Sequence, residues 1–256
     1  MPIVRSGDAD IAYDVTGEGD PLLLVMGLGA DSKGWTAQTP VFAERHRVIT
    51  FDNRGAGRSS TPPGSYTTEQ MGRDALAVLD AAGIERADVC GVSLGGLTAL
   101  WLGIHAPDRV GCLVAANTAA RLGSREGWSD RIEQVRAGGM EAVAEGGLAR
   151  WFTSGFRDTH PETADRFRAM LLACPVEGYT GACAVLRDAD LRADLGRIAA
   201  PTLVVSGTHD TATPPALGAE IAAGVREART IELDAAHLSN VEQPIAFTAA
   251  VLDFLA

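Results

Sequence analysis

A serine stands between two glycines in the stretch Asp88-Val89-Cys90-Gly91-Val92-Ser93-Leu94-Gly95-Gly96-Leu97-Thr98-Ala99-Leu100. The apolar run before Ser93 is typical of a buried strand, and the Gly- and Ala-rich apolar run after it is typical of a helix. A nucleophile at the tight turn between them has strained dihedral angles, and only small residues at Gly91 and Gly95 let strand and helix pass each other. The G-x-S-x-G spacing therefore predicts a nucleophile elbow; an ordinary glycine-rich turn is the alternative.

Length and composition indicate one large α/β domain with room for an insertion. The chain has 256 residues, of which 46% are hydrophobic and 21% are charged, as is ordinary for a globular protein. Its net charge of −11 argues against nucleic acid or an anionic membrane as a partner. A small anionic substrate stays possible if cations gather at the pocket.

Two further patterns concern location and metals. The longest apolar run, at 22–30, is too short to span a bilayer, and no apolar secretory segment opens the chain, so we expect a cytoplasmic protein. The cysteines show no C-x-x-C pairing and no spacing with histidine that would suggest zinc. We therefore expect buried free thiols, no metal and no cofactor; the cysteines are Cys90, Cys112, Cys174 and Cys183.

Short apolar runs recur along the chain with helical patterns between most of them, which predicts buried parallel strands joined by crossover helices. Residues 3–15 alternate between polar and apolar and predict an antiparallel hairpin at the edge of the sheet. The apolar runs lie at 22–26, 48–51, 87–91, 112–116, 203–206 and 230–233. Helices are expected at about 68–82, 94–105, 214–224 and 242–255.

The strand pattern is interrupted between about 120 and 190, where amphipathic stretches predict four short helices. They lie at 130–136, 141–152, 163–174 and 180–187. We expect a core formed by 1–120 and 191–256, with a helical cap inserted at 121–190. A cap over the carboxyl ends of the strands would serve as a substrate lid; a purely stabilising subdomain is the alternative.

A serine nucleophile needs a base, and the base needs an orienting acid. In elbow-type hydrolases the chain order is Ser, acid, His. Asp210 directly follows one predicted strand, and His237 follows the next. Ser93, Asp210 and His237 would thus meet at the carboxyl edge of the sheet, where open α/β sheets carry their sites.

Other residues compete for these roles. His209 is the main alternative base but follows the wrong strand, and Asp234 is the main alternative acid but lies only three residues before His237. His46 is interpreted as a surface helix end, and His105 as the end of the elbow helix. His160, before Pro161, is interpreted as part of a surface loop of the cap.

Backbone N–H groups are the expected oxyanion donors. The N–H of Leu94 follows the nucleophile at a helix N-terminus, and Leu28, in the small-residue loop Met26-Gly27-Leu28-Gly29-Ala30, is the candidate for the second donor. For that loop, a plain glycine-rich turn is the alternative. The loop at 52–59 lacks the G-K-[ST] of a phosphate-binding loop, so we expect a structural turn braced by Asp52 and Arg54.

These residues together resemble the α/β-hydrolase family with a helical cap, over nearly the whole chain. The resemblance implies a mostly parallel eight-stranded sheet and the triad Ser93, Asp210 and His237. Many members carry His-Gly at the oxyanion loop where this chain has Met26-Gly27, but a backbone donor needs no imidazole. The matching motifs are Met26-Gly27-Leu28-Gly29, Asp52-x-Arg54-Gly55-x-Gly57-x-Ser59, the elbow, Gly207-x-x-Asp210 and Ala236-His237.

Within that family the chain is similar to the 3-oxoadipate enol-lactonases of the β-ketoadipate pathway of aromatic catabolism. The supporting stretches lie at 91–97, 116–123, 150–153, 174–179 and 235–244, several of them in the cap. The resemblance implies a serine hydrolase that opens a small anionic lactone to 3-oxoadipate without a cofactor. The alternatives are another capped carboxylesterase, a C–C bond hydrolase, a cofactor-free perhydrolase or, with a non-catalytic role, a binding module.

A carboxylate on the substrate would need a cation in this acidic protein. The candidates for binding it are Arg121 at the junction of strand and cap, Arg131, and the pair Arg150-Trp151. A solvated surface arginine is the alternative at each position.

Overall fold

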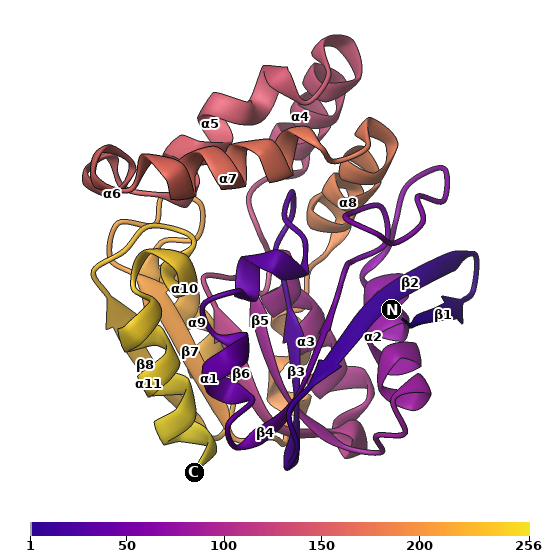
Figure 1. The fold of residues 1–256 in the computed structure, drawn as a ribbon, viewed down its shortest axis with the longest axis vertical. Helices are drawn as coiled ribbons and strands as arrows, with labels where there is room; N and C mark the ends of the chain where they lie inside the picture. Colours follow the sequence, from indigo (N-terminus) through magenta and orange to yellow (C-terminus); the bar gives the residue numbers. More distant parts are fainter. Residues whose placement is uncertain (1) are drawn as a thin grey trace.

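An eight-stranded sheet runs through the centre of the molecule (Figure 1). Its strands are β1 (Ile3–Ser6), β2 (Ala9–Thr16), β3 (Asp20–Val25), β4 (His46–Phe51), β5 (Ala87–Val92), β6 (Val110–Ala116), β7 (Thr202–Gly207) and β8 (Ala228–Leu233). This computed structural model describes residues 2–256. The strand order is β1-β2-β4-β3-β5-β6-β7-β8; β2 is antiparallel to both its neighbours, and the other pairs are parallel. The predicted mostly parallel sheet with an edge hairpin is confirmed.

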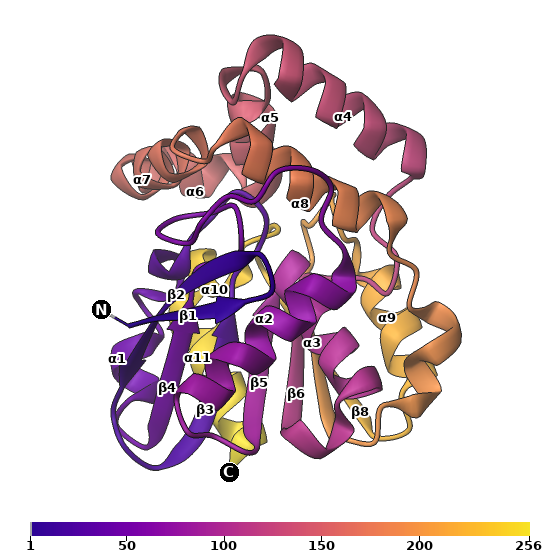
Figure 2. The same ribbon diagram turned by 90° about the vertical axis from the view of Figure 1, so that its right-hand side faces the viewer.

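Helices cover both faces of the sheet (Figure 2). They are α1 (Thr39–Phe42), α2 (Thr68–Ala81), α3 (Leu94–His105), α9 (Pro215–Gly224), α10 (Ser239–Glu242) and α11 (Pro244–Leu255). In β3, Leu23 and Val25 belong to the core that includes α2, α3 and α9. Leu22 and Leu24 belong to the opposite core, with α1 and α11. Burial on both faces explains why the central strands are continuous apolar runs.

Three local expectations are wrong. The run at 230–233 was expected to be a buried strand, but β8 is the edge strand beside β7 and is half-exposed. Cys112 is only half-buried because it lies in the first, partly open part of β6. His46 is not a surface helix end: it begins β4 and is buried.

Five helices lie between β6 and β7, above the edge at which the parallel strands end (Figure 1). They are α4 (Arg125–Gly138), α5 (Glu141–Trp151), α6 (Ser154–Thr159), α7 (Pro161–Leu172) and α8 (Val176–Asp188). Four helices were expected here, and α6 was not among them. Because α6 buries none of its residues, its sequence shows no periodic pattern of apolar residues. The boundaries at 121 and 190 remain a prediction.

No single helix within residues 2–256 is long and apolar enough to cross a membrane. Only α7 and α8 taken together pass that test of length and composition, and they are bent by 95° relative to each other.

Helix α8 contacts the core through a glycine. A Cβ atom added to Gly178 would lie 2.1 Å from the carbonyl oxygen of Gly55. Nearby, the Gly64 N–H donates to Glu177 at 2.9 Å, and the Tyr66 N–H donates to the Gly181 carbonyl at 3.1 Å. This side of the cap is therefore fixed to the loop that follows β4.

Replacing Gly178 with alanine is expected to destabilise the protein by about 1–3 kcal/mol, because the methyl group would overlap the Gly55 carbonyl. Helix propensity alone predicts the opposite sign, a gain of up to about 1 kcal/mol. Gly155→Ala on α6, where a Cβ atom meets nothing within 4 Å, is the matched control. Urea unfolding measures both; equal effects of the two substitutions would contradict the close contact.

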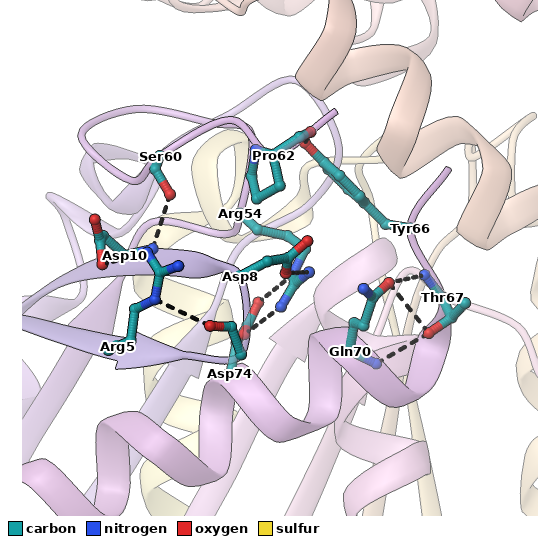
Figure 3. A network of polar contacts seen from close by, with 11 residues as sticks. Arg5, Asp8, Asp10, Arg54, Ser60, Pro62, Tyr66, Thr67, Gln70 and Asp74 are labelled. Carbon is teal, nitrogen blue, oxygen red and sulfur yellow. Dashed lines mark hydrogen bonds and ion pairs between the residues drawn. The ribbon is translucent and has the colours of Figure 1, made fainter. Parts of the chain in front are cut away.

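The loop at 52–59 is a structural turn, but Arg54 braces more than the turn itself. Figure 3 shows its guanidinium between Asp74 of α2 and Asp8 of the edge hairpin. The two bonds to Asp74 measure 2.7 and 2.8 Å, and the bond to Asp8 measures 3.0 Å. Asp52 accepts hydrogen bonds from the N–H groups of Ser32 and Arg58, each at 2.9 Å.

Candidate active site

The turn between β5 and α3 has the geometry expected of a nucleophile elbow. Ser93 has φ 58° and ψ −118°, a strained conformation for a residue with a side chain. A Cβ atom at Gly91 would lie 2.1 Å from the Gly95 carbonyl oxygen, and one at Gly95 would lie 2.0 Å from the Val25 carbonyl oxygen. Glycine is therefore required at Gly91 for β5 and α3 to pass each other, and at Gly95 for α3 to lie against the end of β3.

The structure brings the three predicted side chains into one hydrogen-bonded row. Nε2 of His237 lies 2.8 Å from Oγ of Ser93, and Nδ1 of His237 lies 2.8 Å from Oδ2 of Asp210. Each residue follows the carboxyl end of a different parallel strand, and all three are buried. The arrangement suits a base that removes the serine proton and an acid that orients the base.

Asp210 is held in its ionised form. Burial alone would raise its pKa, but hydrogen bonds and the attraction of His237, with the hydrogen bonds of Thr213, outweigh burial and lower the pKa below its usual value. The Thr213 hydroxyl donates to Oδ2 at 2.6 Å, and the N–H groups of Ala212 and Thr213 donate to Oδ1 at 2.8 and 2.9 Å. The carboxylate can therefore stabilise an imidazolium at His237.

The loop after β3 lies against the nucleophile. A Cβ atom at Gly27 would be only 3.1 Å from the Cβ of Ser93, because β3 and β5 are neighbours in the sheet. Leu28 lines the same cavity as Ser93, and Leu94 is the first residue of α3. Both remain candidates for the oxyanion donors; a helix N-terminus also favours negative charge.

A cavity of about 400 Å³ lies between the hydrogen-bonded row and the helices of the cap. Ser93 and His237 form its floor, and Trp128, Trp151 and Tyr179 are among the cap residues that line it. The exposed residues in its lining all come from α4 and the segment before it: Gly123, Ser124, Gly127, Asp130 and Gln134. The cavity therefore opens to solvent beside α4.

Two arginines of the cap line this cavity, Arg131 from α4 and Arg150 from α5. Burial, together with the positive charge of Arg131, lowers the pKa of Arg150. In residues 2–256, the buried Nη2 of Arg150 has no hydrogen-bond partner. An unpaired buried guanidinium N–H beside a second cation is costly without an anion, so the pair is well suited to bind one.

Comparison with known proteins identifies the family. The sequence model of the alpha/beta hydrolase fold matches residues 20–244. The chain belongs to the α/β-hydrolase family.

Two relatives of this hydrolase are enol-lactonases. The 3-oxoadipate enol-lactonase 2 of Acinetobacter baylyi is 39% identical, over 98% of this chain and 97% of its own length. The crystal structure of the enol-lactonase from Burkholderia xenovorans LB400 is also 39% identical and superposes with a TM-score of 0.98 over 99% of both chains. These likenesses support an enzyme that hydrolyses carboxylic esters.

A third relative is a thermophilic esterase from Thermogutta terrifontis, solved with malate bound. It is 30% identical, with a TM-score of 0.94 over 99% of this chain and 97% of that one.

The competing residues of the hydrolase lie outside the row of three. His209 and Asp234 bond to each other at 2.8 Å on the surface, so neither reaches Ser93. His105 ends α3, where it stacks on Trp101, and His160 is exposed between α6 and α7.

Of the predicted substrate-binding residues, Arg131, Arg150 and Trp151 line the cavity of the hydrolase, but Arg121 does not. Its side chain is 45% exposed and lies 3.8 Å from Asp190, outside the cavity. Arg121 precedes α4 at the foot of the cap, where its side chain is drawn to a surface carboxylate.

Two polar residues of the site were not predicted. Thr213 lies three residues after Asp210, a spacing typical of a side chain that closes a turn on a carboxylate. Asn117 follows β6 in a left-handed conformation, with φ 45°, and its amide donates to Asp210 at 3.1 Å. Asn117 follows a fourth strand at the same edge of the sheet, and a polar residue at such a position was the signal that could have identified it.

Proposed function

We propose that this hydrolase opens 3-oxoadipate enol-lactone with water to give 3-oxoadipate. The observation that carries the proposal is the pair of cations Arg131 and Arg150 in the cavity above Ser93, where, within residues 2–256, the buried Nη2 of Arg150 has no hydrogen-bond partner. A lactone that bears a carboxymethyl group supplies the missing anion while it presents its carbonyl to the serine. The enol-lactonase relatives support the same substrate.

Acylation uses the hydrogen-bonded row. Oγ of Ser93 attacks the lactone carbonyl as Nε2 of His237 takes its proton, and the N–H groups of Leu28 and Leu94 stabilise the oxyanion. The bond to the ring oxygen then breaks, and the proton passes from His237 to the departing enol oxygen. The enol becomes the ketone, which favours opening.

Deacylation repeats the proton transfer with water. His237 removes a proton from water, the hydroxide attacks the acyl carbonyl, and the proton returns to Oγ of Ser93. Asp210, whose pKa is lowered mainly by its interaction with His237 against the effect of burial, holds the imidazole in one tautomer throughout. The product leaves as a dicarboxylate.

Replacing Arg150 with glutamine is expected to raise KM for the enol-lactone, since a charged hydrogen bond worth about 1.5–3 kcal/mol is lost, or roughly 10- to 150-fold. Arg131→Gln should act in the same direction. KM for neutral p-nitrophenyl acetate should change less than about threefold, because that interaction is absent from its complex. The loss of enol-lactone ultraviolet absorbance follows the reaction.

Arg121→Gln is the matched control, because Arg121 lies outside the cavity. If neither Arg131→Gln nor Arg150→Gln raises KM for the anionic lactone more than KM for the neutral ester, the proposed substrate is wrong.

A carboxylesterase for neutral esters is the second candidate, supported by the likeness to the Thermogutta terrifontis esterase. It predicts a higher kcat/KM for the neutral ester than for the enol-lactone in the unsubstituted enzyme. The malate bound in that relative is itself a dicarboxylate, so the likeness is also compatible with an anion-binding cavity.

A further inference from the structure

A carboxylate outside the triad joins the histidine loop to the cap. Glu242, at the end of α10, accepts a hydrogen bond from the N–H of Ala236, the residue before His237, at 2.9 Å. It also accepts hydrogen bonds from Thr153, which follows α5: one from the backbone N–H, 3.3 Å from Oε1, and a short one from the hydroxyl. One side chain thus bonds to both segments.

The two main chains also meet directly. The Leu238 N–H donates to the Trp151 carbonyl at 3.0 Å, and the His237 N–H donates to the Arg150 carbonyl at 3.4 Å. Residues 150–153 of the cap and residues 236–238 of the core therefore form a short seam, and Glu242 lies across it.

The backbone of Ala236, the residue before His237, is held at both its N–H and its carbonyl group. Glu242 accepts from the Ala236 N–H, and the amide of Asn117 donates to the Ala236 carbonyl at 3.2 Å. The imidazole is bonded to Asp210 and Ser93 at its two nitrogens. On the cap side, the placement of the ring thus depends on the seam and on Glu242.

The same seam carries a substrate-facing side chain. Arg150 contributes its carbonyl oxygen to the histidine loop and its guanidinium to the cavity lining. A shift of residues 150–153 therefore moves the base and the cation together.

We propose that Glu242 is a positioning residue, which fixes His237 relative to Ser93 by tying the histidine loop to the cap. The proposal rests on the catalytic roles proposed above for Ser93 and His237. A displacement of about 1 Å at a catalytic group can cost about 10²-fold in rate, so a residue that touches no substrate can still control turnover.

The test compares Glu242→Gln, Thr153→Val and the double variant with the unsubstituted enzyme. Two readouts are used: the rate at which a fluorophosphonate modifies Ser93, and kcat and KM for p-nitrophenyl acetate. Glu242→Gln is expected to lower the modification rate and kcat by about 10- to 100-fold, with KM within about threefold of its original value. Thr153→Val should have a smaller effect of the same kind, and the double variant should be no slower than Glu242→Gln, because both act through one contact.

Glu232→Gln, an exposed carboxylate on β8, is the control and should leave both rates unchanged. Folded Glu242→Gln enzyme with unchanged modification rate and kcat would overturn the proposal, as would a change in KM alone. If Glu242→Gln does not fold, an unchanged modification rate in Thr153→Val overturns it instead. An unreactive Ser93 in the unsubstituted enzyme would overturn the triad assignment itself, which is a separate and recognisable failure.

Discussion

Replacing Ser93 with alanine is expected to lower kcat for ester hydrolysis by about 10⁴-fold or more. The covalent route needs its Oγ, which lies 2.8 Å from Nε2 of His237. Initial rates with the enol-lactone and with p-nitrophenyl acetate measure the loss, and circular dichroism checks that the variant folds. A fluorophosphonate should add its mass to Ser93 in the unsubstituted protein and add nothing in Ser93→Ala.

His237→Ala serves as the companion variant. If Ser93→Ala keeps most of its activity while His237→Ala loses it, the histidine acts directly on water and no acyl-enzyme forms. If both variants keep their activity, the row of Ser93, His237 and Asp210 is not the active site.

Replacing Arg54 with methionine is expected to destabilise the protein by about 3–5 kcal/mol, because it leaves the Asp74 carboxylate buried without its partner. The two side chains are 2% and 1% exposed, respectively. Urea unfolding should show a lower midpoint with little change in slope.

Arg5→Met is the control. Arg5 and Asp10, both labelled in Figure 3, form an ion pair whose side chains are 61% and 52% exposed, so it should contribute less than about 1 kcal/mol. Removing both buried charges, in Arg54→Met with Asp74→Leu, should recover much of the loss. A double variant as unstable as Arg54→Met would instead assign the effect to lost packing.

The sheet could be predicted because its central strands are buried on both faces and so form unbroken apolar runs. The three residues of the row could be predicted because parallel strands bring their following loops to one edge. Helix α6 could not be predicted, because it buries none of its residues and therefore shows no periodic apolar pattern. The burial of His46 at the start of β4 could not be predicted either, because this residue lies in a charged stretch of the sequence.

Side-chain direction was the other missing information. The sequence does not show which of the arginines 121, 131 and 150 faces the cavity. In the structure, Arg121 pairs with a surface carboxylate, while Arg131 and Arg150 line the cavity. Partners distant along the chain were equally hidden. Arg54 was expected to brace its own turn, but its strongest partner, Asp74, lies twenty residues away on α2.

The position of the cavity mouth determines how small molecules reach the serine. The cap contacts the core through α8, where Gly178 meets Gly55, through α7, where the Asp31 N–H donates to Met170, and through residues 150–153 at the histidine loop. The exposed lining residues lie at none of these contacts but in α4 and the segment before it.

Substrate and product can therefore exchange along one side of the cap while the cap stays in place. A long acyl or alcohol chain can extend past Ser124 and Asp130 into solvent, whereas bulk directed toward Tyr179 or Trp151 meets buried walls. Tolerance for substrate size is thus directional. To accept bulkier substrates on the buried side, the cavity would need smaller side chains on α5 or α8. To exclude long substrates, it would need only larger side chains at the exposed start of α4.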